Sequence, residues 1–203
     1  NVPNELLEQL DRDFCVLFAG NIGQAQSIET LIAAAEKVKH IPEIKLIIVG
    51  SGSALAWAKH EVEQKQLHNV IFTGRYPAEV MPFLFAKAKG LLVTLRDQDI
   101  FSYTVPSKVQ AYMCAGRPII AGINGEAARV VAEAKSGLVC PAEDSTGLAN
   151  KISQLFYMSE SEREIMGKNG RRYFLAHFEL KQKCKELVGI FQQNIDLKRQ
   201  KSE

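Results

Sequence analysis

The sequence has 203 residues, of which 46% are hydrophobic and 24% are charged, with a formal net charge of +2 at pH 7. This is the composition of an ordinary soluble globular protein that can bury a sizeable core. Because the charge is nearly balanced, the composition gives no reason to expect binding to nucleic acid or to bulk membrane. Its four cysteines never form a CxxC pair, so we expect no zinc site, no disulfide framework and a reducing compartment.

Short apolar runs alternate along the chain with segments whose apolar residues recur at helical spacing. This alternation predicts an α/β fold, a Rossmann-like doubly wound parallel sheet of about six strands, followed by C-terminal helices. The expected strands are Phe14–Gly20, Ile44–Gly50, Val70–Gly74, Leu91–Leu95, Pro118–Gly122 and Gly137–Cys140. The expected helices are Ile28–Val38, Ala54–Gln66, Ala78–Lys87, one that begins at Pro106, Glu126–Ala134, a helical stretch from Ser145, and a last helix from Phe178 to about Ile195.

Glycine follows four of the expected strands, in the segments Gly20-Asn21-Ile22-Gly23, Gly50-Ser51-Gly52, Gly74 and Gly122. Ligands of open parallel sheets bind outside the carboxyl ends of the strands, and glycine lets the backbone approach a ligand closely there. Each of these glycines could equally serve a tight turn. Four of them on one rim favour a phosphate-bearing ligand.

The stretch Tyr103–Arg117, YTVPSKVQAYMCAGR, contains a helix start next to this rim. Pro106 suits a first helical turn, and the following free N–H groups and the helix dipole attract anions. Ser107 and Lys108 add a hydroxyl group and a cation, so we expect an anion site, with phosphate as the anion. An ordinary helix start with a solvated lysine is the alternative.

Other phosphate and metal motifs are missing from the sequence. The loop GNIG lacks the GxGxxG spacing, the P-loop pattern is absent, and the four histidines have no ligand spacing. We therefore expect no metal site.

Five stretches of the chain, in order, resemble the C-terminal, donor-binding half of a GT-B glycosyltransferase of the large retaining family 4 group. These are FAGNIGQAQSIETLIAAA, LIIVGSGSAL, VIFTGRYPAEVMPFL, YTVPSKVQAYMCAGRPIIAGINGEAARVV and SGLVCPAEDSTGLANKI. Within that group, the GNIG loop and the PSK helix start look most like bacterial transferases that build O-antigen, capsule or exopolysaccharide.

The resemblance implies a nucleotide-sugar-binding Rossmann-like domain over residues 1–175 and a C-terminal helix with a basic tail over residues 176–203. It implies transfer of a sugar from a nucleoside-diphosphate sugar, with a UDP-sugar favoured as substrate, and no cofactor. The glycan or lipid-linked acceptor would bind an N-terminal domain that we expect to be absent from this chain, so the fragment alone would be inactive. The expected location is cytoplasmic, with peripheral association with the inner face of the membrane left open for the full-length protein.

Several positions depart from the family pattern. Asn21 and Gln26 stand where many members carry an Arg and a Lys on the donor diphosphate, and Tyr103 and Ala111 stand where many carry two glutamates. Lys108 would therefore supply most of the charge that compensates the diphosphate, with Arg75 or Arg96 as further sources.

The resemblance assigns roles to the remaining positions. Ser107 and Lys108 would stabilise the leaving diphosphate. Arg75 and Tyr76 would lie near the base or ribose, Tyr103 would face the donor sugar, and Glu126 would either approach the sugar or cap its helix. The full set of donor-binding residues expected is Gly20, Asn21, Gly23, Gln26, Gly50, Gly52, Arg75, Tyr76, Tyr103, Pro106 and Glu126.

Two alternatives remain open at this point. The chain could be a nucleotide-sugar-binding module without transfer activity, which the missing glutamates favour. It could also be a GT-B-like enzyme such as a UDP-N-acetylglucosamine epimerase, although more acidic residues and histidines would then be expected at the cleft.

Overall fold

The structure, a computed structural model, describes residues 2–200, and for residues 182 and 193–200 the backbone alone. Within these residues six strands form one parallel sheet in the order β3-β2-β1-β4-β5-β6. The strands are β1 (Phe14–Asn21), β2 (Ile44–Ser51), β3 (Val70–Gly74), β4 (Gly90–Thr94), β5 (Ile119–Gly122) and β6 (Gly137–Cys140). The chain runs outward from β1 to β3, then crosses back to β4 on the other side of β1. The predicted Rossmann-like fold is therefore confirmed, and its topological switch point lies between β1 and β4.

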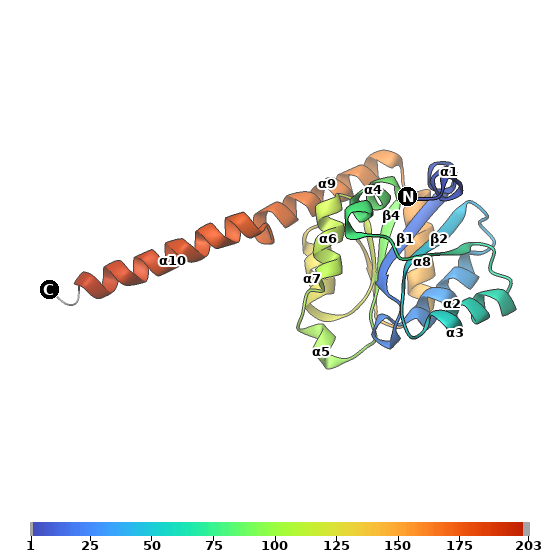
Figure 1. The fold of residues 1–203 in the computed structure, drawn as a ribbon, viewed down its shortest axis with the longest axis horizontal. Helices are drawn as coiled ribbons and strands as arrows, with labels where there is room; N and C mark the ends of the chain where they lie inside the picture. Colours follow the sequence, from blue (N-terminus) through green and yellow to red (C-terminus); the bar gives the residue numbers. More distant parts are fainter. Residues whose placement is uncertain (1, 201–203) are drawn as a thin grey trace.

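Helices cover both faces of the sheet (Figure 1). One face carries α2 (Ile28–Val38), α3 (Leu55–Gln64) and α8 (Ser145–Tyr157). The other carries α1 (Asn4–Arg12), α4 (Met81–Lys87), α6 (Ser107–Ala115), α7 (Gly125–Glu133) and part of α9 (Glu160–His177). Short helices η1 (Gln24–Gln26), η2 (Ala78–Val80) and α5 (Asp99–Ser102) lie in the connections, and α10 (Leu180–Gln200) ends the described chain.

Strand side chains alternate between two buried clusters, as expected for a sheet covered on both sides. Val16 and Phe18 of β1 point into the cluster with α2 and α8, whereas Leu17 and Ala19 point into the cluster with α4 and α6. Because both faces are buried, the strands read as continuous apolar runs rather than as an alternating pattern. This is the physical reason why the six strands could be predicted closely from the sequence.

The α-helices α1 and α5, and the short helix η1 in the loop after β1, were not predicted. Helix α1 buries only Leu6 and Leu10, so its apolar spacing gives a weak signal. The segment from Arg96 to Val105, expected to be a polar loop, contains the single-turn helix α5. The last helix begins and ends later than predicted, because Phe178 terminates α9 and α10 starts at Leu180.

Helix α10 projects away from the rest of the molecule (Figure 1). Its Leu180, Leu187, Val188 and Phe191 are all exposed. Within residues 2–200, every helix is too short or too polar to cross a lipid bilayer.

Candidate functional site

The carboxyl ends of β1 and β2 lie unusually close together. Gly20 and Gly50 are partners in the parallel register, both with positive φ, at 137° and 149°. A methyl group at Gly50 would lie 1.9 Å from the Gly20 carbonyl oxygen, so a side chain cannot be accommodated there without moving the strand. Gly52 packs in the same way against the Ile22 carbonyl, 2.3 Å from where its Cβ would be. The two glycine turns therefore form a thin backbone rim.

A cavity of about 770 Å³ opens beside this rim. Its walls come from the ends of β1 and β2, the segment after β3, helix α4 and the first turns of α6. Eight of the predicted site residues line it: Gly20, Asn21, Gly50, Gly52, Arg75, Tyr76, Ser107 and Lys108. The other lining residues are Ala19, Val49, Ser51, Ala78, Met81, Phe85, Ala111 and Tyr112. Segments far apart in the sequence thus meet at the carboxyl edge of the sheet, as the parallel topology requires.

Helix α6 is held against β1 by Tyr112. This side chain is buried, and its hydroxyl group accepts a hydrogen bond from the Ala19 backbone N–H at 3.0 Å. The pairing of β1 with β4 ends at Phe18, so the Ala19 N–H has no partner on β4. The Tyr112 hydroxyl group supplies the acceptor for this N–H instead. The Tyr112 ring also packs edge-to-face on Phe85 of α4, with ring centroids 5.2 Å apart. Tyr112 therefore fixes the start of α6 relative to the rim, a role that its apolar-looking position in the sequence did not indicate.

Lys108 is the most unusual side chain of the cavity. Its Nζ is buried and has no hydrogen-bond partner among residues 2–200. It lies 3.7 Å from the centroid of the Phe18 ring, and a methyl group on Gly20 would be 3.2 Å from it. Burial lowers the pKa of Lys108 to about 7. The expected alternative, a solvated lysine at an ordinary helix start, is therefore wrong: the ammonium group sits in the wall of the cavity at the positive end of the α6 dipole.

Five predicted site residues do not line the cavity. Gly23 and Gln26 lie further along the loop after β1, where Asn21 Nδ2 is 3.4 Å from Gln26 Oε1. Pro106 is the N-cap of α6 and precedes the lining residues. Tyr103 is 82% exposed, after α5.

Glu126 also lies outside the cavity and forms two hydrogen bonds to Arg129, at 2.6 and 2.8 Å. This pairing lowers the pKa of the Glu126 carboxyl group. The helix-capping role considered for Glu126 is not what the structure shows, since Asn124 is the N-cap of α7.

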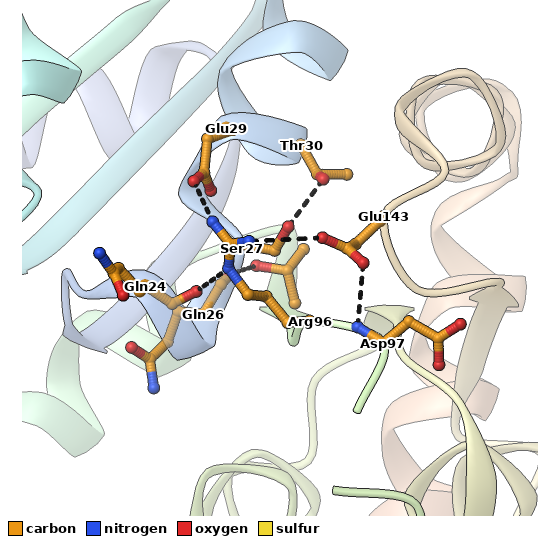
Figure 2. Close-up of polar contacts among 9 residues, drawn as sticks. Gln24, Gln26, Ser27, Glu29, Thr30, Arg96, Asp97 and Glu143 are labelled. Carbon is orange, nitrogen blue, oxygen red and sulfur yellow. Dashed lines mark hydrogen bonds and ion pairs between the residues drawn. The ribbon is translucent and has the colours of Figure 1, made fainter. Parts of the chain in front are cut away.

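Arg96 does not line the cavity and forms its contacts elsewhere (Figure 2). Its guanidinium group pairs with Glu29 and donates to the Gln24 carbonyl at 2.7 Å. Glu143 accepts a hydrogen bond from the Asp97 backbone N–H at 3.1 Å. These contacts join the loop after β4 to the loop after β1 and to the segment after β6. Lys108 and Arg75 are therefore the cations that line the cavity.

A doubly wound sheet with a cationic cavity at the carboxyl ends of its strands is the architecture of a nucleotide-binding domain. The comparison of sequences gives the family. Residues 6–173 match the family described as "Glycosyl transferases group 1", and the chain belongs to this family.

Two bacterial glycosyltransferases are similar to this chain. It is 29% identical over 163 residues to the probable glycosyltransferase WbjE of Pseudomonas aeruginosa, covering 77% of this chain and 40% of the relative. It is also 29% identical over 165 residues to the O-antigen chain mannosyltransferase C of Escherichia coli, covering 80% and 42%. The chain thus spans less than half the length of these relatives.

Solved GT-B glycosyltransferases share the fold. The crystal structure of Anabaena Alr3699/HepE in complex with UDP superimposes with a TM-score of 0.79 at 18% identity, covering 93% of this chain and 52% of the other. The family and the fold implied by the sequence resemblance are therefore confirmed, whereas the retaining family 4 subgroup stays a prediction.

Proposed function

We propose that this chain is the donor-binding half of a glycosyltransferase that moves a sugar from a nucleoside-diphosphate sugar, with a UDP-sugar favoured, to a cell-surface polysaccharide or lipid-linked acceptor. The acceptor binds the N-terminal half of the full-length enzyme, so we expect the 203-residue chain by itself to be inactive. The enzyme works in the cytoplasm.

The buried ammonium group of Lys108 carries this proposal. A buried cation without a hydrogen-bond partner is unfavourable, and an anion in the adjoining space would supply that partner. The free N–H groups of the first turn of α6 and the Ser107 hydroxyl group lie beside it, so a phosphate at this point would receive several donors at once. The cavity of about 770 Å³ has room for the rest of a nucleotide.

The same arrangement supports a chemical step. When the glycosidic bond of the donor breaks, the electron pair of that bond goes to the β-phosphate oxygen, and negative charge builds there. Lys108 and the N-terminus of α6 stabilise this charge in the transition state more than in the ground state, without a metal ion. Asn21 contributes an amide donor from the end of β1. Arg75 and Tyr76, which also line the cavity, contact the base or the ribose.

The names of the relatives support the substrate class. The Escherichia coli relative is an O-antigen chain mannosyltransferase, and the Anabaena structure holds UDP. Both are consistent with a nucleotide-sugar donor and a surface glycan as product.

Calorimetry with a panel of nucleoside diphosphates tests the binding half of the proposal. We expect UDP to bind the 203-residue chain with a dissociation constant below 1 mM, and Lys108→Met to weaken binding by about tenfold to a hundredfold, the usual worth of a charged hydrogen bond. Met keeps the apolar stem that packs near Phe18. Lys168→Met, at an exposed lysine paired with Glu164 on α9, is the matched control and should change nothing.

The proposal fails if none of the diphosphates binds at millimolar concentration or if Lys108→Met leaves their affinities unchanged. Restoring the N-terminal half and measuring sugar transfer then distinguishes an enzyme from a module that only binds. A ring-opened or epimerised product without an acceptor would instead identify an epimerase.

A further inference from the structure

The side chain of Lys108 crosses the carboxyl edge of the sheet. Helix α6 packs on the same face as α4, whereas the Phe18 ring belongs to the buried cluster on the opposite face, with α2 and α8. Lys108 Nζ nevertheless lies over this ring, 3.7 Å from its centroid. The side chain passes Gly20, where a Cβ would be 3.2 Å from both Lys108 Cε and Nζ. The ammonium group therefore rests against an aromatic ring from the other face of the sheet.

The Phe18 ring is held in place by the strand and by the core. Phe18 is the last residue of β1 that pairs with β4, opposite Leu92, and Lys108 reaches the ring just where this pairing ends. The side chain is 1% exposed and packed within its cluster, so the core fixes its orientation. The ring thus presents a fixed face to the ammonium group.

This ring face is the favourable electrostatic contact of a cation that is otherwise poorly served. Lys108 Nζ has no hydrogen-bond partner among the described residues, and burial lowers its pKa without an opposing contribution from a carboxylate in that part of the chain. The other titratable groups that line the cavity, those of Arg75, Tyr76 and Tyr112, are cationic or neutral. A cation over an aromatic ring is attracted by the ring quadrupole, most strongly when both are out of water. Phe18 therefore favours the charged form of Lys108.

We propose that Phe18 is a positioning residue of the anion site, whose ring holds the Lys108 ammonium group in its charged form at the edge of the sheet, both in the empty cavity and when a diphosphate is bound. The inference rests on the proposed function, since it assumes that the anion belongs to a nucleoside diphosphate. Phe18 does not line the cavity, so it acts on the ligand only through Lys108.

Stepwise fluorination of the Phe18 ring tests this role, because fluorine withdraws electron density from the ring face with little change in size. The 203-residue chain is prepared with 4-fluoro-, 3,5-difluoro- or 3,4,5-trifluorophenylalanine at position 18 and titrated with UDP at two pH values. At pH 8 Lys108 is mostly neutral in the free protein, so the complex alone loses the attraction. We expect the affinity to fall with each added fluorine, by about tenfold in the trifluoro protein. At pH 6 the free and the bound protein both carry the charge, and the loss should be about twofold or less.

Fluorination of Phe14 is the matched control. Phe14 is also a buried ring of β1 in the same cluster, but it contacts Phe156 and Arg163 rather than Lys108. Its fluorination should leave the affinity for UDP unchanged at both pH values. A second readout needs no nucleotide: the pKa of Lys108, followed by NMR in the free protein, should fall below about 7 in the Phe18 series and stay there in the Phe14 series.

Two results would overturn the inference and leave the nucleotide site standing. One is an affinity for UDP at pH 8 that does not change across the Phe18 series. The other is a fall in the pKa of Lys108 without a fall in affinity, which would show that the ring holds the charge only while the cavity is empty. If the chain with natural phenylalanine does not bind UDP, the proposed function has failed and this inference with it.

Discussion

At the scale of single residues, the site depends on a charge that the fold holds out of water. Lys108 Nζ is buried between the Phe18 ring and the end of β1, without a hydrogen-bond partner in the described chain. This placement destabilises the free protein, because a buried ammonium group loses its hydration. The result is an amino group already in position when an anion arrives, so no side chain has to be ordered at that moment.

The pH dependence of UDP binding follows from this placement. The pKa of Lys108 is lowered to about 7, whereas the complex needs the charged form, so binding above pH 7 must be accompanied by proton uptake. We expect UDP to bind about tenfold more weakly at pH 8 than at pH 6, because the charged fraction of the free protein falls by about that factor.

The control for this measurement is Lys108→Met, whose affinity should not fall over the same interval. Ionisation of the nucleotide works in the opposite direction, since a terminal phosphate loses its last proton near pH 6 and then binds a cation better. An affinity of the unchanged chain that stays constant or rises from pH 6 to pH 8 would contradict the assigned role of Lys108.

At the scale of elements, the site is produced by strand ends and a helix start that converge on one edge of the sheet. The φ angle of Gly50 and the Gly20 carbonyl oxygen, which would lie 1.9 Å from a Cβ at position 50, both require glycine. The Tyr112 hydroxyl group then joins α6 to β1. The glycines were predictable from the sequence, but their partnership and the role of Tyr112 depend on the register of β1 with β2 and on the packing of α6.

Two glycine substitutions distinguish a requirement for glycine that comes from a steric contact from one that comes from the backbone φ angle. In Gly50→Ala the new methyl group meets the Gly20 carbonyl oxygen at 1.9 Å, and we expect the free energy of unfolding to fall by about 2 to 3 kcal/mol. At Gly74 φ is 77°, but a new methyl group meets no described atom within 4 Å. In Gly74→Ala only the left-handed backbone conformation is unfavourable, so we expect the free energy of unfolding to fall by about 1 kcal/mol. Urea denaturation of both variants checks this order. Equal losses would show that the contact with Gly20 is not what requires glycine at position 50.

At the scale of the whole molecule, the compact α/β body and the projecting helix α10 differ in how they are stabilised. The body buries two apolar clusters, one on each face of the sheet, and α9 ends against it through Tyr173, Phe174 and Phe178. The apolar side chains of α10 such as Leu187 and Val188 are at least half exposed. Most of the folding free energy therefore belongs to the body.

Shortening the chain after Glu179 tests this division. The variant keeps Phe178 on the body and removes α10 with the residues that follow it. We expect the free energy of unfolding to change by less than about 1 kcal/mol, a small fraction of the stability of an ordinary domain. Urea denaturation measures this change, and binding of a dye for exposed apolar surface should decrease. A loss of several kcal/mol would mean that α10 stabilises the body directly.

The sequence by itself determined the class of fold and the position of the proposed phosphate site. Strands buried on both faces leave continuous apolar runs, and glycine and Pro-Ser-Lys patterns are local signals that need no tertiary information. The short amphipathic helix α1 and the single-turn helix α5 were missed because so few of their residues contact the core.

Only the tertiary structure decided which predicted residues meet. Local pattern cannot tell that Arg96 is paired with Glu29, that Glu126 is paired with Arg129, or that Tyr103 faces solvent. It also cannot tell a solvated lysine from a buried one. That difference depends on Phe18 and Gly20, which lie about 90 residues earlier in the sequence and reach Lys108 only because β1 and β4 are neighbours in the sheet.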